Sequence, residues 1–135
     1  MIRYPIPPQR ILAVDDEPLV RQTIQIVLRA EGHYVSAVGS GAEALEELAR
    51  SPYDVVFTDH IMSGMTGAEL ASIIKARHPS QIVIMLSAYG NVIDQLTQET
   101  PRVDFVLTKP IDILLLRLML LRLISHKALK TPVSL

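Results

Sequence analysis

The sequence predicts a single α/β domain in which a parallel sheet carries helices on both faces. Five short apolar runs alternate with amphipathic segments, which is the pattern of buried parallel strands connected by helices. The chain has 135 residues, the size of one ordinary domain, so we expect no second folded module. We divide it into a leader (1–9), one domain (10–126) and a tail or truncated linker (127–135).

Each apolar run is predicted to form a strand. The five strands are predicted over residues 11–14, 34–38, 55–58, 82–86 and 105–107. The run at 34–38 is the least uniformly apolar, which suits a strand at the edge of the sheet.

The first two connecting segments have the spacing of amphipathic helices. Pro18 suits the first position of a helix, and Gly32 ends it. The apolar residues between them recur at helical spacing: Val20, Ile24, Val27 and Leu28. A second helix is predicted over residues 41–50, with Leu45 and Leu48 facing inward.

Three further helices are predicted. The third covers residues 66–77 and ends before Pro79. The fourth is a segment of roughly two turns that Pro101 limits. Its thin apolar stripe consists of Val92, Ile93 and Leu96. The fifth covers residues 111–124, of which eleven of fourteen are apolar.

Composition excludes several functions. Thirteen basic residues against fourteen acidic ones give a net charge of -1, so there is no basic field to hold nucleic acid. The absence of cysteine excludes thiol chemistry and fits a cytoplasmic location. The leader contains no signal-peptide pattern. As a helix, residues 111–124 would span about 21 Å and carry charges, too short for the ~30 Å membrane core, so we expect no membrane contact.

Polar residues follow four of the predicted strands. Asp15 and Asp16 follow the first, Asp59 the third, Ser87 the fourth and Lys109 the fifth. The carboxyl ends of parallel strands share one edge, where open α/β sheets bind ligands. Three carboxylates in one small space call for a cation, and Mg²⁺ prefers such ligands together with phosphate oxygens. Lys109 and Ser87 add donors suited to a transferring phosphoryl group.

Three other functions could use an α/β sheet or an acidic site of this kind. A resident nucleotide or flavin phosphate needs small residues and free N–H groups after the first strand, whereas residues 15–17 are all acidic. No glycine-rich phosphate-binding motif occurs in the chain. A Mg²⁺-dependent phosphohydrolase with an aspartyl nucleophile remains an alternative, as does a module with the same site that binds partners without phosphorylation.

The chain from Arg10 to about Ser125 resembles the receiver domain of two-component response regulators, such as those of chemotaxis. The resemblance rests on the ordered set that follows the strands: Asp15-Asp16, Asp59 with Met62, Met65 and Gly67, Ser87-Ala88, and Lys109-Pro110. It implies a flavodoxin-like, doubly wound (βα)5 fold with three layers and strand order 2-1-3-4-5.

The same resemblance implies the role of each site residue. Asp59 would accept a phosphoryl group from a histidine kinase or a histidine phosphotransfer protein. Lys109 would pair with the resulting acyl phosphate, and Ser87 would turn toward it as the switch. The protein would act as a phosphoacceptor and not as an enzyme. The implied magnesium ligands are Asp16, Asp59 and the backbone carbonyl of Ile61, with Asp15 acting through water.

Several positions depart from the family pattern, and others carry expectations about structure that the fold can test. Ser63 replaces the usual proline, and Val106 stands where many members have an aromatic switch residue, with Phe105 one position away. Ile61 and Tyr89 are predicted to border the path of attacking water, so we expect a slowly decaying phosphoryl group. The remaining two expectations are a cis Lys109-Pro110 bond and a surface position for His60.

The last predicted helix carries two apolar stripes. The inward stripe comprises Ile113, Leu116, Leu120, Leu123 and Ile124. A second strip lies about a third of the way round the helix: Leu114, Leu118 and Leu121. Exposed apolar strips mark contact surfaces, unless a neighbouring helix covers them. The sequence thus suggests a homodimer or a partner surface at this helix.

Overall fold

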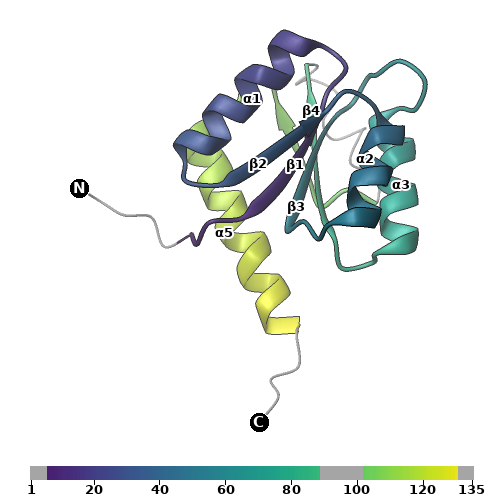
Figure 1. Ribbon diagram of the computed structural model, residues 1–135. Helices are drawn as coiled ribbons and strands as arrows, with labels where there is room; N and C mark the ends of the chain where they lie inside the picture. Colours follow the sequence, from purple (N-terminus) through teal and green to yellow (C-terminus); the bar gives the residue numbers. More distant parts are fainter. Residues whose placement is uncertain (1–5, 89–101, 131–135) are drawn as a thin grey trace.

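Five parallel strands form one sheet in the order β2-β1-β3-β4-β5 in the computed structural model, which describes residues 6–88 and 102–130 (Figure 1). The strands are β1 (Arg10–Val14), β2 (Tyr34–Val38), β3 (Val55–Asp59), β4 (Ile82–Ser87) and β5 (Phe105–Thr108). The predicted order and the predicted edge position of 34–38 are both confirmed.

Four helices lie in the described part of the chain. They are α1 (Pro18–Ala30), α2 (Gly41–Arg50), α3 (Gly67–Arg77) and α5 (Ile113–Lys130). Figure 1 shows α1 and α5 on one face of the sheet and α2 and α3 on the other. The fold therefore has the three layers expected. The helix predicted around Val92 and Ile93 lies outside the described residues.

Alternate residues of the central strands supply two separate cores. Ile11 and Ala13 of β1 face the α1 and α5 side, where they join a cluster that includes Phe57 and Leu116. Leu12 of β1 faces the α2 and α3 side and packs in the second cluster. Since each central strand is apolar on both faces, its runs show no polar alternation. Apolar burial on both sides holds the strand ends rigidly in register.

Local sequence sets where the helices begin and end. Pro18 is the first residue of α1, and Gly32, with a φ of 94°, follows its end as predicted. Ser40 and Thr66 cap α2 and α3 by accepting backbone N–H groups at 3.1 Å. Asp112 similarly accepts the N–H of Leu115 at 3.1 Å, so α5 begins two residues later than predicted.

Helix α5 has the two apolar stripes that its sequence suggested. Leu116, Met119 and Leu120 are buried against the sheet. The second strip is exposed: Leu114, Leu118 and Leu121, together with Leu115 beside them. The helix also continues beyond the predicted position 124, into the segment predicted as a tail. Within the described ranges, no helix combines the length and the apolar content needed to cross a bilayer.

Candidate functional site

The carboxyl ends of β1, β3, β4 and β5 bring the predicted site residues to one edge of the sheet. The strand register aligns Val14 with Thr58, and Ser87 with Thr108. Asp59 ends β3, while Asp15 and Lys109 follow β1 and β5 at the same level. The site is thus assembled from segments far apart in the sequence.

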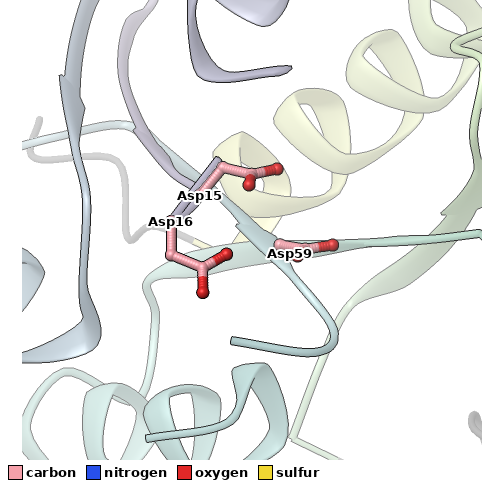
Figure 2. A group of neighbouring side chains, drawn as sticks. All are labelled: Asp15, Asp16 and Asp59. Carbon is pink, nitrogen blue, oxygen red and sulfur yellow. The ribbon is translucent and has the colours of Figure 1, made fainter. Parts of the chain in front are cut away.

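Three carboxylates form the acidic part of the site. Asp15, Asp16 and Asp59 each offer one oxygen, and these oxygens lie within 4.8 Å of one another (Figure 2). Asp15 and Asp59 are buried, and Asp16 is half-buried. Backbone N–H groups of Glu17 and Ser63 donate to Asp15 Oδ1 at 3.0 Å and to Asp16 Oδ2 at 2.9 Å. These bonds orient the carboxylates before any ligand arrives.

The ammonium group of Lys109, which follows β5, bridges the carboxylates of Asp15 after β1 and Asp59 at the end of β3. Its Nζ lies 2.8 Å from Asp59 Oδ1 and 3.3 Å from Asp15 Oδ2. Its backbone N–H donates to the carbonyl of Ser87 at 2.8 Å, which fixes the start of the loop after β5. The Lys109-Pro110 peptide bond is cis, as predicted.

Burial and neighbouring charges shift the ionisation of this pair. Burial is the main cause that raises the pKa of Asp59, and the charge of Asp15 adds to it, although the bond from Lys109 acts in the opposite direction. Burial by itself would lower the pKa of Lys109, but the hydrogen bonds and charges of Asp59 and Asp15 outweigh it and raise the pKa. Lys109 is therefore charged at neutral pH and gives the site a fixed positive charge.

The donor set suits a hard divalent cation. All three candidate ligands are carboxylates, which Mg²⁺ and Ca²⁺ prefer to nitrogen or sulfur. Burial keeps the pKa of Asp59 raised despite the bond from Lys109, so one more positive charge would still be favourable at this edge. The residues present thus fit a magnesium site of the kind the sequence predicted.

A cavity of about 200 Å³ opens beside the three carboxylates. Its lining consists of Glu17, Asp59, His60, Ile61, Ala88 and Lys109. Ile61 is exposed at its rim, where the sequence suggested that it borders the path of water. Tyr89, its predicted companion, lies outside the described residues. Ser87 is fully buried at the end of β4 and directly precedes Ala88, which lines this cavity.

Two sequence-based expectations need comment. His60 is half-buried beside Asp59, not a surface residue, and its buried Nδ1 has no hydrogen-bond partner among residues 6–88 and 102–130. Its backbone N–H bonds the carbonyl of Leu86 at 3.0 Å, which holds the residue against β4. Val106 is buried beside Met85, whereas the neighbouring Phe105 is partly exposed, as alternation along a strand requires.

Two residues to which the sequence assigned no role contribute to the site, although one of them, Gly67, belongs to the ordered set that follows the strands. Arg21 of α1 donates from Nη1 to the backbone carbonyl of Asp15 at 2.7 Å. Gly67 donates its backbone N–H to the carbonyl of His60 at 3.0 Å and allows α3 to start directly against Asp59. The only signal for Arg21 in the sequence is a cation near the amino end of a helix, where the helix dipole disfavours it.

Comparison with known proteins shows the family of the chain. The family model for the response regulator receiver domain matches residues 11–121. The response regulator protein PilR of Pseudomonas aeruginosa is 37% identical over 131 residues, which are 93% of this chain and 29% of PilR. The transcriptional regulatory protein GlrR of Escherichia coli is 36% identical over 105 residues, 78% of this chain and 24% of GlrR. The chain therefore spans about a quarter of the length of these relatives.

Solved structures give the same result. The response regulator TrrA from Thermotoga maritima, crystallised in complex with Mg²⁺ and BeF, has a TM-score of 0.76 and 30% identity. The match covers 85% of this chain and 98% of that one. A receiver domain from Clostridium thermocellum has a TM-score of 0.81 and 27% identity, covering 90% and 98% of the two chains. The chain belongs to the response regulator receiver domains of two-component signal transduction.

Proposed function

We propose that Asp59 accepts a phosphoryl group from a histidine kinase or a histidine phosphotransfer protein, and that the domain then signals through altered protein contacts. The observation that carries this proposal is the buried Asp59 carboxylate, held 2.8 Å from Lys109 with two further carboxylates beside it. A carboxylate in this setting is both a nucleophile and part of a cation site. The family supports the general role, and the proposed role of each residue rests on the family resemblance together with these distances.

In the proposed transfer, a carboxylate oxygen of Asp59 forms a bond to phosphorus while the P–N bond of the donor phosphohistidine breaks. The electron pair of that bond returns to the donor imidazole, so atoms and charge balance. Lys109 already contacts Asp59 Oδ1, and its ammonium group is placed to stabilise charge on the phosphoryl oxygens. Ser87 then supplies a hydroxyl donor to one of these oxygens from the end of β4.

Mg²⁺ would be held by Asp16, Asp59 and the backbone carbonyl of Ile61, with Asp15 acting through water. When bound, the ion neutralises charge that develops on the phosphoryl oxygens. The complex of TrrA with Mg²⁺ and BeF supports the choice of metal. The chain's own contribution is the prior orientation of Asp15 and Asp16 by backbone N–H groups.

Intact-mass measurement after incubation with acetyl phosphate and Mg²⁺ tests the proposal. Wild type should gain one phosphoryl group, and Asp59→Ala should gain none. A gain in both proteins, or in neither, would contradict the assignment. Repeated hydrolysis of small phosphate esters would instead favour the alternative, a phosphohydrolase. We propose that the domain is a phosphoacceptor with slow autodephosphorylation and not a turnover enzyme.

A larger, mostly apolar cavity next to the site is the proposed docking place of the phosphodonor protein. Its volume is about 510 Å³, and it lies between α1 and the loop after β5. The lining residues are Leu19, Val20, Thr23, Ile24, Val27, Leu86, Lys109, Pro110 and Ile111. Because Lys109 lines both cavities, a protein seated here could present its phosphohistidine directly to Asp59.

Leu19 provides a test of this docking place. It lines the cavity and is 79% exposed, so its replacement should not disturb folding. Leu19→Glu should slow transfer from a histidine phosphotransfer protein while acetyl phosphate still reacts at the wild-type rate. Ile26→Glu is the matched control, since Ile26 is 62% exposed on the same helix and does not line the cavity. Equal transfer to both variants would contradict the proposal.

The output surface is proposed to be the exposed strip of α5 formed by Leu114, Leu118 and Leu121, through which two copies could pair. The strip stays exposed on a helix whose other face is buried, and isolated domains rarely expose contiguous apolar residues without a partner. The usual aromatic readout is absent at Val106, which also favours a route through α5. Sedimentation of wild type with and without a phosphoryl mimic tests this, and a monomer at high concentration in both states would rule out the dimer.

We further propose a cytoplasmic location and no nucleic-acid contact by this chain. The net charge of -1 gives no basic field for a polyanion. GlrR is described as a transcriptional regulatory protein, but the chain matches only 24% of it. Any DNA binding in such proteins can therefore reside in their remaining parts.

A further inference from the structure

Arg21 near the start of α1 reaches back into the loop that carries the acidic pair. Its Nη1 donates to the backbone carbonyl of Asp15 at 2.7 Å. Asp15 is fully buried, so its carbonyl needs a donor from the protein. The position gives the helix itself no advantage, because a cation near the amino end of a helix opposes the helix dipole. The contact with Asp15 is therefore the reason for a charged side chain there.

The guanidinium group is seated against Gly39 at the end of β2. A Cβ atom on Gly39 would lie 3.0 Å from Nη1 and 3.7 Å from Cζ of Arg21. Two hydrogen bonds from backbone N–H groups hold the loops around this guanidinium. The N–H of Asp15 donates to the carbonyl of Val38 at 3.2 Å, and the N–H of Gly39 donates to the side-chain Oε2 of Glu43 at 2.8 Å. A side chain at this position would require the end of the guanidinium group to shift.

The bond from Arg21 fixes the orientation of the peptide from which the Asp16 side chain extends. The carbonyl of Asp15 and the amide of Asp16 belong to one planar peptide, so holding the carbonyl also fixes the plane that carries Asp16. From that plane Asp16 Oδ2 reaches the N–H of Ser63 at 2.9 Å. We propose that Arg21 is a positioning residue for the magnesium site, acting through the Asp15-Asp16 peptide. This inference rests on the proposed function, because it takes Mg²⁺ as the bound ion.

The positioning role of Arg21 and its charge predict opposite effects on the affinity for Mg²⁺ when Arg21 is removed. As a charge alone, a cation near three carboxylates repels a divalent ion, and its removal would tighten binding of Mg²⁺. As an outer-shell support of a ligand, it strengthens the site, and loss of such support typically weakens metal binding by about 10-fold or more. The direction of the change in Kd therefore separates the two roles.

Titration of the metal-free full chain with Mg²⁺ alone, followed by backbone amide NMR shifts, measures this Kd. Arg21→Met should raise the Kd by about 10-fold. Arg21→Lys, which keeps the charge but lacks the planar guanidinium, should also raise it, though less. Arg29→Met is the matched control, because Arg29 lies on the same helix and donates to the backbone carbonyl of Val35 at 3.0 Å, away from the site. Its Kd should equal that of wild type.

Gly39→Ala supplies a second route to the same result, in case Arg21→Met does not fold. The added methyl group crowds the guanidinium, so it should weaken Mg²⁺ binding in the wild-type background and have no effect in an Arg21→Lys or Arg21→Met background. An Arg21→Met protein that binds Mg²⁺ as tightly as wild type, or more tightly, would overturn this inference and leave the proposed function intact. Wild type that binds no Mg²⁺ would overturn the metal part of the proposed function, and the inference with it.

Discussion

Replacing Gly67 by alanine should disturb the proposed phosphoacceptor through its backbone. Gly67 is the first residue of α3, and a Cβ atom there would lie 2.1 Å from the backbone oxygen of Asp59 and 3.1 Å from its carbonyl carbon. The N–H of Gly67 also donates to His60 at 3.0 Å, so the helix cannot slide away without losing this bond. The added methyl group thus presses on the strand end that carries the acceptor.

The size of the effect follows from the contact distance. To reach an allowed separation, α3 or the Asp59-His60 peptide must move by roughly 1 Å. Overpacking of this kind costs about 1–3 kcal/mol. For a domain of this size, that corresponds to a fall in Tm of roughly 3–15 °C. A displacement of roughly 1 Å at a reacting group can slow the reaction about 100-fold, so phosphorylation by acetyl phosphate should be strongly reduced.

Gly41→Ala is the matched control. Gly41 is likewise the first residue of a helix that follows a serine or threonine N-cap. Its added Cβ would meet the side chain of Met65, with Sδ at 2.7 Å, and a methionine can change rotamer. Thermal unfolding and the rate of phosphorylation are measured for both variants. If Gly67→Ala matches Gly41→Ala in both, the argument from backbone contact is wrong.

Three further predictions concern ionisation and the lifetime of the phosphoryl group. Burial raises the pKa of Asp59, so the free energy of unfolding of the metal-free protein should fall as pH rises from the usual aspartate range through the raised pKa. Asp59→Asn should not show this fall, and identical pH profiles of the two proteins in EDTA would refute the prediction. Ile61→Asn should shorten the lifetime of the aspartyl phosphate by admitting water, and an unchanged autodephosphorylation rate would exclude this role for Ile61. The hydrogen bond from Arg117 lowers the pKa of Glu31, so this pair stabilises the fold above the usual glutamate range and loses its effect as pH falls through the lowered pKa. Arg117→Met should accordingly cost about 1 kcal/mol in urea unfolding at pH 7 and less in acid, whereas a loss independent of pH would point to packing alone.

Most of the sheet could be predicted because its sequence signal is local. Buried parallel strands are continuous apolar runs, and each predicted strand agrees with the structure to within one residue at either end. The position of Asp59 at the end of such a run was equally visible. The order of the strands and the assignment of roles came from the family resemblance, since no pattern of apolar residues fixes which strands are neighbours.

The parts that the sequence did not reveal depend on contacts between distant segments. The bond from Arg21 to Asp15 joins α1 to the loop after β1, and the guanidinium lies against Gly39, which follows β2. Helix α5 began later than predicted because Asp112 caps it, which apolar periodicity cannot show. Met119 was not placed in the inward stripe, although it is buried. His60 is half-buried because its backbone is tied to β4, a contact that its own neighbours in sequence do not indicate.

The bridge from Lys109 to Asp15 and Asp59 has a consequence for how the protein matures. Lys109 and Asp15 lie 94 residues apart, so the bridge forms only after the last strand has joined the sheet. Contacts of such high sequence separation form late and slowly in folding. A chain still emerging from the ribosome, or one misfolded at its last strand, would present Asp59 without its lysine. The proposed phosphoacceptor site is therefore complete only after the last strand has joined the sheet.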